Sequence, residues 1–340
     1  MASLERQFGV GMAGLAGASL LTGAVMRCKG RRARARRYML HERPDGSLVE
    51  VDVRIPPQAE RVVLLDNGLG TPHEYWDWVC EALPPDLGYV KFNRPGYGLS
   101  SSPAGYGLEY HFALLQELRE TFTGELPLVL AGHSLGGYLV AAYASRHPGA
   151  ARGVTSVVMV DATDVAHLRS SRRSEVDRWS RQSMLMERAY AMAGVAAFRP
   201  ALNKFETYRQ DVNRSSRAFL AEPRTWAMAH RDYRDAMTYP ELTSLDLPLT
   251  VVTAENNQGD NDAHRVVQSR MATLSERSRH RFVEGSDHET ILSVQLFAEQ
   301  VAKAITDEPP TGPAGAESEQ AADGRPADGN GGRGEELTSA

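Results

Sequence analysis

Residues 126–146 read LPLVLAGHSLGGYLVAAYASR, and this stretch decides the fold. It begins with a short run of apolar residues typical of a buried strand, and it ends in a helical pattern. Between the two lies the motif Gly132-x-Ser134-x-Gly136. A serine at a tight turn from strand to helix is held in a strained conformation with its hydroxyl exposed, and the flanking glycines remove Cβ atoms that would collide with nearby backbone. Ser134 is therefore a candidate nucleophile.

Short apolar runs alternate with helical patterns on both sides of this stretch, which predicts a mostly parallel sheet with helices on both faces. Residues 38–41 and 49–54 are expected to form an antiparallel hairpin at the edge of that sheet. Six further strands are expected to end at Asp66, Phe92, Gly132, Val160, Ala254 and Glu284. The alternation of strand and helix patterns stops after Thr163, so residues 164–246 are expected to form a helical insertion.

Composition and charge limit the function classes. The chain has 340 residues, 42% of them hydrophobic, which allows a sizeable core and excludes a disordered class. Residues 1–37 carry a net charge of +7, whereas residues 38–306 and 307–340 carry −6 each. A mildly acidic body disfavours nucleic acid as a partner. The only cysteines, Cys28 and Cys80, exclude a disulfide scaffold and a paired-cysteine zinc site, and no cofactor or metal is expected.

The two ends of the chain differ from the body. Residues 8–26 are uncharged over about the length of a bilayer core but include five glycines, and a basic run, residues 27–37, follows them. This pattern predicts a transmembrane helix or weak membrane anchor on the cytoplasmic side, with a mobile leader on a cytoplasmic protein as the alternative. Export is disfavoured, because only Arg6 precedes the apolar run. The acidic residues 307–340 are expected to be a disordered tail.

Two further motifs bring out a resemblance. Residues 67–70 read NGLG and follow the third strand, and residues 93–100 read NRPGYGLS. Together with the serine motif, they make residues 38–306 resemble the α/β-hydrolase superfamily, whose oxyanion loop has His where this chain has Asn67, and whose D-R-P-G-x-G-x-S turn has Asp where it has Asn93. Both departures are interpreted as tolerated variation.

The resemblance implies a fold and an oxyanion site. It implies an α/β-hydrolase fold, with a mostly parallel eight-stranded sheet, helices on both faces and a helical lid after strand six. It also implies that the backbone N–H groups of Leu69 and Leu135 form the oxyanion hole.

The base and the acid of the site also follow from the resemblance. The base should follow the last strand, and His288 fits that position. Family members usually place the acid after the seventh strand, where this chain has Asn257 at the usual position and Asp260 three residues later. Some members use the end of the sixth strand, which is Asp161 here. We favour Asp161, because the end of a strand holds a side chain more rigidly than a loop does. Asp260 is the alternative.

These residues imply a serine hydrolase that cleaves a small or medium carboxylic ester, or a lactone, thioester or amide, through an acyl-enzyme. A lid generally holds an apolar acyl substrate away from water, and Met184, Met186 and Met192 could offer it a soft surface. Acyl transfer in a biosynthetic pathway would use the same residues. A catalytically silent binding protein is the alternative from another class, supported by Asn67 and Asn257. The oligomeric state is not predicted.

Overall fold

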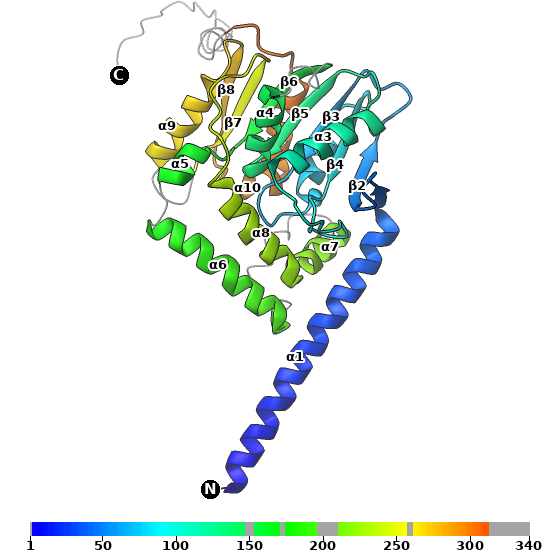
Figure 1. Cartoon of the computed structure of the whole chain (residues 1–340), viewed down its shortest axis with the longest axis vertical. Helices are drawn as coiled ribbons and strands as arrows, with labels where there is room; N and C mark the ends of the chain where they lie inside the picture. Colours follow the sequence, from blue (N-terminus) through cyan, green and yellow to red (C-terminus); the bar gives the residue numbers. More distant parts are fainter. Residues whose placement is uncertain (1, 147–152, 171–173, 196–209, 257–260, 313–340) are drawn as a thin grey trace, which may run out of the picture.

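The structure is a computed structural model of the whole chain. It describes residues 2–146, 153–170, 174–195, 210–256 and 261–312, and Figure 1 shows their arrangement.

One sheet of eight strands runs through the described part of the chain, in the order β1-β2-β4-β3-β5-β6-β7-β8. β2 pairs antiparallel with β1 and β4, and every other pairing is parallel. The strands are β1 (Met39–Glu42), β2 (Leu48–Arg54), β3 (Arg61–Asp66), β4 (Leu87–Phe92), β5 (Leu128–His133), β6 (Val154–Val160), β7 (Leu249–Ala254) and β8 (Ser278–Val283). The predicted mostly parallel eight-stranded sheet is confirmed.

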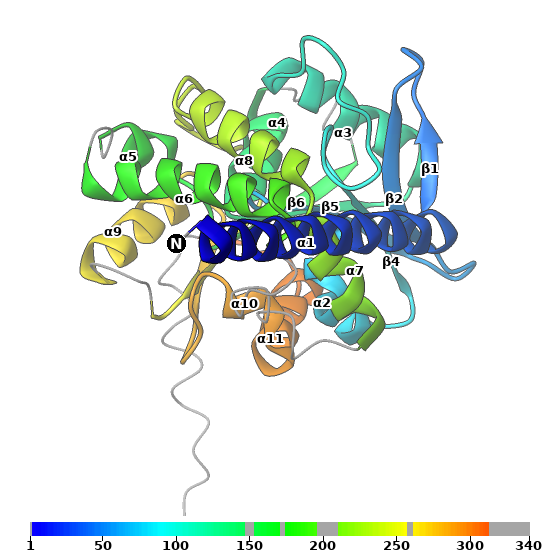
Figure 2. The ribbon, with the colours of Figure 1, turned by 90° about the horizontal axis from the view of Figure 1, so that it is seen from below.

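Helices cover both faces of this sheet (Figure 2). The helices on one face are α3 (Leu108–Phe122), α4 (Leu135–Arg146) and α9 (Asn261–Ala272), and those on the other are α2 (Asp77–Ala82) and α11 (Gln295–Thr306). The central strand β5 is buried along its whole length, as expected for a parallel strand covered on both sides. The hydrophobic core is therefore divided by the sheet into two layers.

Four helices of the described chain lie between β6 and β7, in the interval predicted to be an insertion. They are α5 (Val165–Ser170), α6 (Glu175–Met192), α7 (Gln210–Leu220) and α8 (Pro223–Ala236). α8 packs on the loop after β3, where a Cβ added at Gly70 would lie 3.5 Å from the Trp226 ring and 3.6 Å from the Ala229 methyl group. The insertion therefore covers the carboxyl end of the sheet.

Two local features differ from the sequence prediction. Residues 73–82 were not predicted to be helical, yet they form the short helix η1 (His73–Trp76) and α2. The shared apolar face of Ile291, Val294 and Phe297 predicts one last helix, but the structure has two, α10 (Thr290–Ser293) and α11, because Val294 between them is extended, with φ −103° and ψ 124°. Most of the predicted acidic tail, residues 313–340, lies outside the described residues.

The N-terminal residues form a single long helix, α1 (Ala2–Arg37), which projects away from the body (Figure 1). None of the described helices, α1 included, combines the length and the apolar character needed to cross a membrane. The predicted transmembrane helix over residues 8–26 is therefore not supported. Its five glycines lower the mean hydropathy of the segment.

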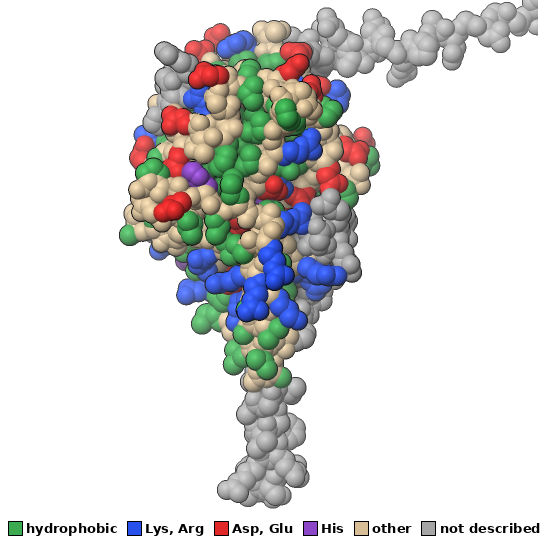
Figure 3. All heavy atoms as spheres, turned by 90° about the vertical axis from the view of Figure 1, so that its right-hand side faces the viewer, with side chains coloured by type: hydrophobic (Ala, Val, Ile, Leu, Met, Phe, Trp, Pro, Cys, Tyr) green, Lys and Arg blue, Asp and Glu red, His purple; other side chains and the backbone are tan. Residues whose placement is uncertain are grey.

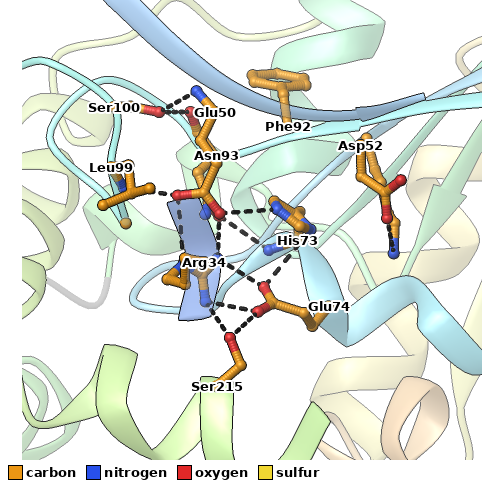
Figure 4. Close-up of polar contacts among 12 residues, drawn as sticks. Arg34, Glu50, Asp52, His73, Glu74, Phe92, Asn93, Leu99, Ser100 and Ser215 are labelled. Carbon is orange, nitrogen blue, oxygen red and sulfur yellow. Dashed lines mark hydrogen bonds and ion pairs between the residues drawn. The ribbon is translucent and has the colours of Figure 1, made fainter. Parts of the chain in front are cut away.

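The last turns of α1 are fixed to the body by a buried ion cluster (Figure 4). The Arg34 guanidinium donates to both carboxylate oxygens of Glu50 in β2, at 2.5 and 3.2 Å, and to both of Glu74 in η1, at 2.5 and 2.8 Å. It also donates to the hydroxyl oxygen of Ser215 in α7, at 3.0 Å. One side chain thereby links the N-terminal helix, the sheet and the insertion.

Candidate active site

Ser134 lies in the tight turn between β5 and α4. Its φ is +54°, in the left-handed region that L-residues rarely adopt, as predicted for a serine in such a turn. The flanking glycines leave no room for side chains: an added Cβ would lie 2.3 Å from the carbonyl carbon of Gly136 if placed at Gly132, and 2.6 Å from the Asn67 oxygen if placed at Gly136. The turn therefore requires glycine at both positions and holds the serine hydroxyl in a fixed place.

A chain of hydrogen bonds connects three of the predicted residues. The Nε2 atom of His288 lies 3.1 Å from the hydroxyl oxygen of Ser134, and its Nδ1 atom lies 2.5 Å from Oδ2 of Asp161. With the proton on Nδ1, the imidazole donates to the carboxylate and can accept the serine proton. The structure thus brings Ser134, His288 and Asp161 together. Asp260, the alternative acid, and Asn257 lie outside the described residues.

Asp161 follows the last residue of β6 and is also left-handed, with φ +42°. Its backbone N–H donates to the Val252 oxygen of the neighbouring strand at 2.7 Å, which fixes the turn against the sheet. Burial acts to raise the pKa of this carboxyl, but hydrogen bonds from His264 and His288 outweigh it and hold the pKa well below its usual range. The side chain is therefore a buried carboxylate.

The loop that carries His288 is held by two ring side chains from other elements. His133 donates from Nε2 to the backbone oxygen of His288 at 2.9 Å, and Tyr75 donates to that of Glu289 at 2.6 Å. Burial acts to lower the pKa of His288, but the hydrogen bond and charge of Asp161 outweigh it and raise the pKa. The imidazole is 41% exposed, so solvent and small molecules reach it.

The loop after β3 lies directly beside Ser134, since a Cβ added at Gly68 would be 3.2 Å from the Ser134 Cβ. Arg94 orients this loop: its guanidinium donates to the backbone oxygens of Asn67 and Gly68, the latter at 2.7 Å, and to the Asp66 carboxylate at 3.1 Å. The C=O and N–H of a trans peptide point in opposite directions, and the described chain has no cis peptide. The N–H of Leu69 therefore points away from Arg94. Leu135, the other predicted oxyanion donor, begins α4 directly after Ser134.

An apolar cluster covers this loop. Met184 of α6 and Ala229 and Tyr233 of α8 are buried, and Leu69 and Trp226 pack against them. Of the three methionines expected to face a substrate, Met184 lies in this cluster, but Met186 and Met192 are 51% and 57% exposed. Contact of these methionines with a substrate stays a prediction.

Two residues near the site were missed by sequence reasoning. His264 of α9 lies with Nε2 2.8 Å from the second oxygen of Asp161, and no motif marks it. Arg94 belongs to the NRPG motif, which was a signal, but its contacts with the loop could not be read from spacing. Among the described residues, no group of three or more His, Cys, Asp or Glu side chains could hold a metal ion.

Comparison with known proteins identifies the fold. A curated relative, the proline iminopeptidase of Saccharolobus solfataricus, is 29% identical over 104 residues, and this match covers 30% of the chain and only 34% of the relative. The enol-lactonase structure from Burkholderia xenovorans LB400 is 17% identical with a TM-score of 0.53, covering 79% of this chain and all of that chain. A structure described as a membrane phospholipase A, a novel bacterial virulence factor, is 20% identical with a TM-score of 0.57, covering 90% of this chain and 98% of that one. At these identities, the structural likeness shows the fold alone.

The sequence model of the alpha/beta hydrolase family matches residues 62–304, which is well over half of the chain. This interval includes the serine turn, the loop of His288 and Asp161. The protein therefore belongs to the alpha/beta hydrolase family.

Proposed function

We propose that the protein is a serine hydrolase that cleaves a small or medium carboxylic ester with an apolar acyl group, through an acyl-enzyme. The observation that carries the proposal is the unbroken hydrogen-bond chain from the Ser134 hydroxyl through His288 to Asp161. Ser134 is the nucleophile, His288 the general base and acid, and Asp161 the group that orients His288 and stabilises its imidazolium.

The reaction has two matched halves. The Ser134 oxygen attacks the acyl carbon while its proton passes to Nε2 of His288, and the oxyanion that forms is bound by the backbone N–H groups of Leu69 and Leu135. The C–O bond of the ester then breaks, and His288 gives the proton to the departing alcohol. Water repeats the sequence on the acyl-enzyme, releasing the acid and restoring the serine.

The side chains around the loop after β3 favour a substrate with an apolar acyl group. Leu69, whose N–H is proposed to bind the oxyanion, packs in the same cluster as Met184, Ala229 and Tyr233. An acyl chain bound at the serine would meet these side chains, and burial of each methylene would contribute about 0.8 kcal/mol. We therefore propose that the helices α5 to α8 act as a lid.

A fluorophosphonate probe and a p-nitrophenyl ester series test the proposal. We expect the probe to label the wild-type protein at Ser134 and not Ser134→Ala, and we expect hydrolysis of acyl esters by the wild type only. Ser102, in an exposed loop outside the site, gives the matched control Ser102→Ala, which should be labelled like the wild type. A folded wild-type protein that is neither labelled nor active would favour the silent binding protein.

The bond type and the acceptor are part of the proposal. The same residues would serve a lactone, a thioester or an amide, and acyl transfer to an alcohol or amine would replace water in the second half. Adding competing alcohols to the ester assay separates hydrolysis from transfer, because a transferase forms the new ester in preference to the free acid.

We also propose that α1 and α6 contact a membrane surface from the cytoplasmic side. The two helices are joined by hydrogen bonds from Ser19 to the Ala193 oxygen at 2.9 Å and from Arg27 to the Ala191 oxygen at 3.1 Å. Near this junction the exposed apolar side chains are Leu20, Leu21, Val25, Leu185, Met186 and Met192. Figure 3 shows Lys and Arg side chains gathered where α1 meets the body, with hydrophobic side chains beyond them along the helix. Apolar groups beside basic ones are what an anionic lipid surface binds.

Sedimentation with vesicles tests this contact. We expect the full-length protein to bind phosphatidylcholine vesicles that contain phosphatidylglycerol and to lose binding in Leu20→Ser/Leu21→Ser and in Lys29→Glu/Arg32→Glu. Leu296→Ser, which changes an equally exposed leucine on α11, is the control that should bind like the wild type. Equal recovery of all four proteins with the vesicles would count against the contact.

A further inference from the structure

The Asp161 carboxylate has a second imidazole partner. His288 lies against Oδ2, whereas the Nε2 atom of His264 lies 2.8 Å from Oδ1. The backbone N–H of Ala254 also donates to Oδ1, at 3.0 Å. Since a carboxylate oxygen only accepts, the proton of each of these contacts belongs to nitrogen. His264 therefore donates from Nε2 to the oxygen that His288 does not use.

The contacts to Oδ1, from His264 and from the Ala254 N–H, control a rotation that the contact to Oδ2 leaves free. The last side-chain torsion of an aspartate is broad, so one hydrogen bond to one oxygen defines the carboxylate plane poorly. The Asp161 side chain is completely buried, and the donors to its two oxygens come from different elements: α9 and the end of β7 for Oδ1, and the loop after β8 for Oδ2. The His264 side chain is only 14% exposed, so little water competes for the contact.

Helix α9 holds this turn at two separate points. One helical turn beyond His264, the buried side chain of Gln268 donates to the backbone oxygen of Ala162 at 2.9 Å. Gln268 therefore holds the main chain beside Asp161, and His264 holds the carboxylate itself. Variants of these two side chains can therefore distinguish support of the turn from orientation of the Asp161 carboxylate.

We infer that His264 is a positioning residue, which fixes the carboxylate of Asp161 in the plane where Oδ2 faces Nδ1 of His288. The inference rests on the proposed function, because it acts through the acid of that site. The N–H of His264 donates the hydrogen bond that this task needs. The element after β7, where the family usually carries the acid, here supplies a donor to an acid on β6.

The test compares rate constants for fluorophosphonate labelling and kcat and KM for a p-nitrophenyl ester. His264→Leu removes the donor and His264→Gln keeps an N–H donor that does not titrate. We expect His264→Leu to lower kcat and the labelling rate by about 10-fold to 10²-fold with little change in KM, since misplacement of a catalytic group costs up to about 10²-fold. We expect His264→Gln to recover most of the loss.

The same change in the Asp161→Asn background distinguishes positioning from general support. If His264 acts through the carboxylate, His264→Leu has no further effect on the labelling rate of Asp161→Asn. Gln268→Met is the control, and its effect on labelling should be equal in the two backgrounds. His264→Phe, which fills the space of the ring, replaces His264→Leu if that variant does not fold.

Two results would overturn the inference, and only the second would also overturn the proposed function. In the first, the wild-type protein is labelled, but His264→Leu has no effect or has the same effect in the wild type and in Asp161→Asn. This result removes the positioning role alone. A folded wild-type protein that is not labelled at Ser134 removes both the proposed function and this inference.

Discussion

Two buried clusters in this protein are built from carboxylates and nitrogen donors, and they are arranged in opposite ways. At the serine site one carboxylate, Asp161, is shared by two imidazoles. Where α1 meets the body, one guanidinium, Arg34, is shared by two carboxylates, Glu50 and Glu74 (Figure 4). In both clusters burial opposes the charged carboxylates, and the nitrogen partners more than compensate.

The difference lies in what the nitrogen partner can do with its proton. An arginine keeps its proton at every pH that a protein survives, so Arg34 can only hold elements together. The Arg34 cluster also contains the buried imidazole of His73, whose Nε2 atom lies 3.1 Å from Oε1 of Glu50. A histidine gains and loses a proton near neutrality, so the Asp161 cluster can pass one. The Arg34 cluster is a rigid joint, whereas the Asp161 cluster belongs to the proposed proton-transfer chain.

The largest expected effect is on the acid. Asp161→Asn should lower turnover by about 10⁴-fold, because the amide cannot stabilise the His288 imidazolium by charge. Ester hydrolysis at saturating substrate measures the loss, and circular dichroism checks the fold. Asp260→Asn is the control and should keep wild-type turnover. A loss in Asp260→Asn and not in Asp161→Asn would exchange the roles of the two residues.

The next effect is on the loop beside Ser134. Arg94→Lys keeps the positive charge, but a lysine cannot bond the Asn67 and Gly68 oxygens and the Asp66 carboxylate together. We expect kcat to fall by about 10²-fold, as for loss of one oxyanion donor, with a smaller change in KM. Wild-type kcat in a folded Arg94→Lys protein would mean that the loop keeps its orientation without the guanidinium.

The response to pH should separate the two clusters. His288 must be neutral to accept the serine proton, and its pKa is raised above the ordinary 6.5. kcat/KM should therefore fall about tenfold per pH unit below that raised pKa. Burial acts to raise the pKa of Glu50, but the charge of Arg34 and the hydrogen bond and charge of His73 outweigh it and lower the pKa from 4.5 to about 2. Its stabilisation is complete above pH 4.5 and is lost as the pH falls toward 2.

Near pH 5 the enzyme should consequently have lost most of its kcat/KM but remain folded, and it should regain activity when it is returned to pH 8. Activity assays and circular dichroism on the same samples measure both properties. Loss of activity and unfolding at one common pH would contradict the separation.

The smallest effect on turnover is expected at the rigid joint. Arg34→Met removes the guanidinium that two buried carboxylates share, which costs about 3–5 kcal/mol in the free energy of unfolding. Turnover per folded molecule should stay unchanged, since Arg34 touches none of the residues at the serine site. Urea unfolding measures the first quantity and active-site titration the second. Arg36→Met, which changes an exposed arginine of the same helix, is the matched control with no expected loss.

Sequence reasoning predicted the parts of this molecule that depend on local patterns. Apolar runs gave all eight strands, and the glycine motif and the position after the last strand gave Ser134 and His288. The acid stayed open between Asp161 and Asp260, because both follow strand ends and only distance in space separates them. His264 lies 103 residues from Asp161 and belongs to no motif, so nothing in the sequence pointed to it.

In the N-terminal helix, a clear local pattern did not reveal which of its charges contact the body. Its basic run was interpreted as a flank for anionic lipid, yet Arg31, Arg34 and Arg37 form ion pairs with the body. Charge alone could not reveal this, because the partners Glu222, Glu50 and Asp77 belong to other elements that only the fold brings close. Solvated and buried arginines look the same in a sequence.

The two left-handed residues at the ends of β5 and β6, Ser134 and Asp161, carry a consequence for laboratory evolution. A side chain in that conformation costs about 1–2 kcal/mol, and glycine would not bear this cost. Ser134→Gly should therefore make the protein more heat resistant as it removes the proposed nucleophile. A selection for thermal survival alone would enrich inactive variants at this position, so any search for a more durable enzyme must score turnover in every round.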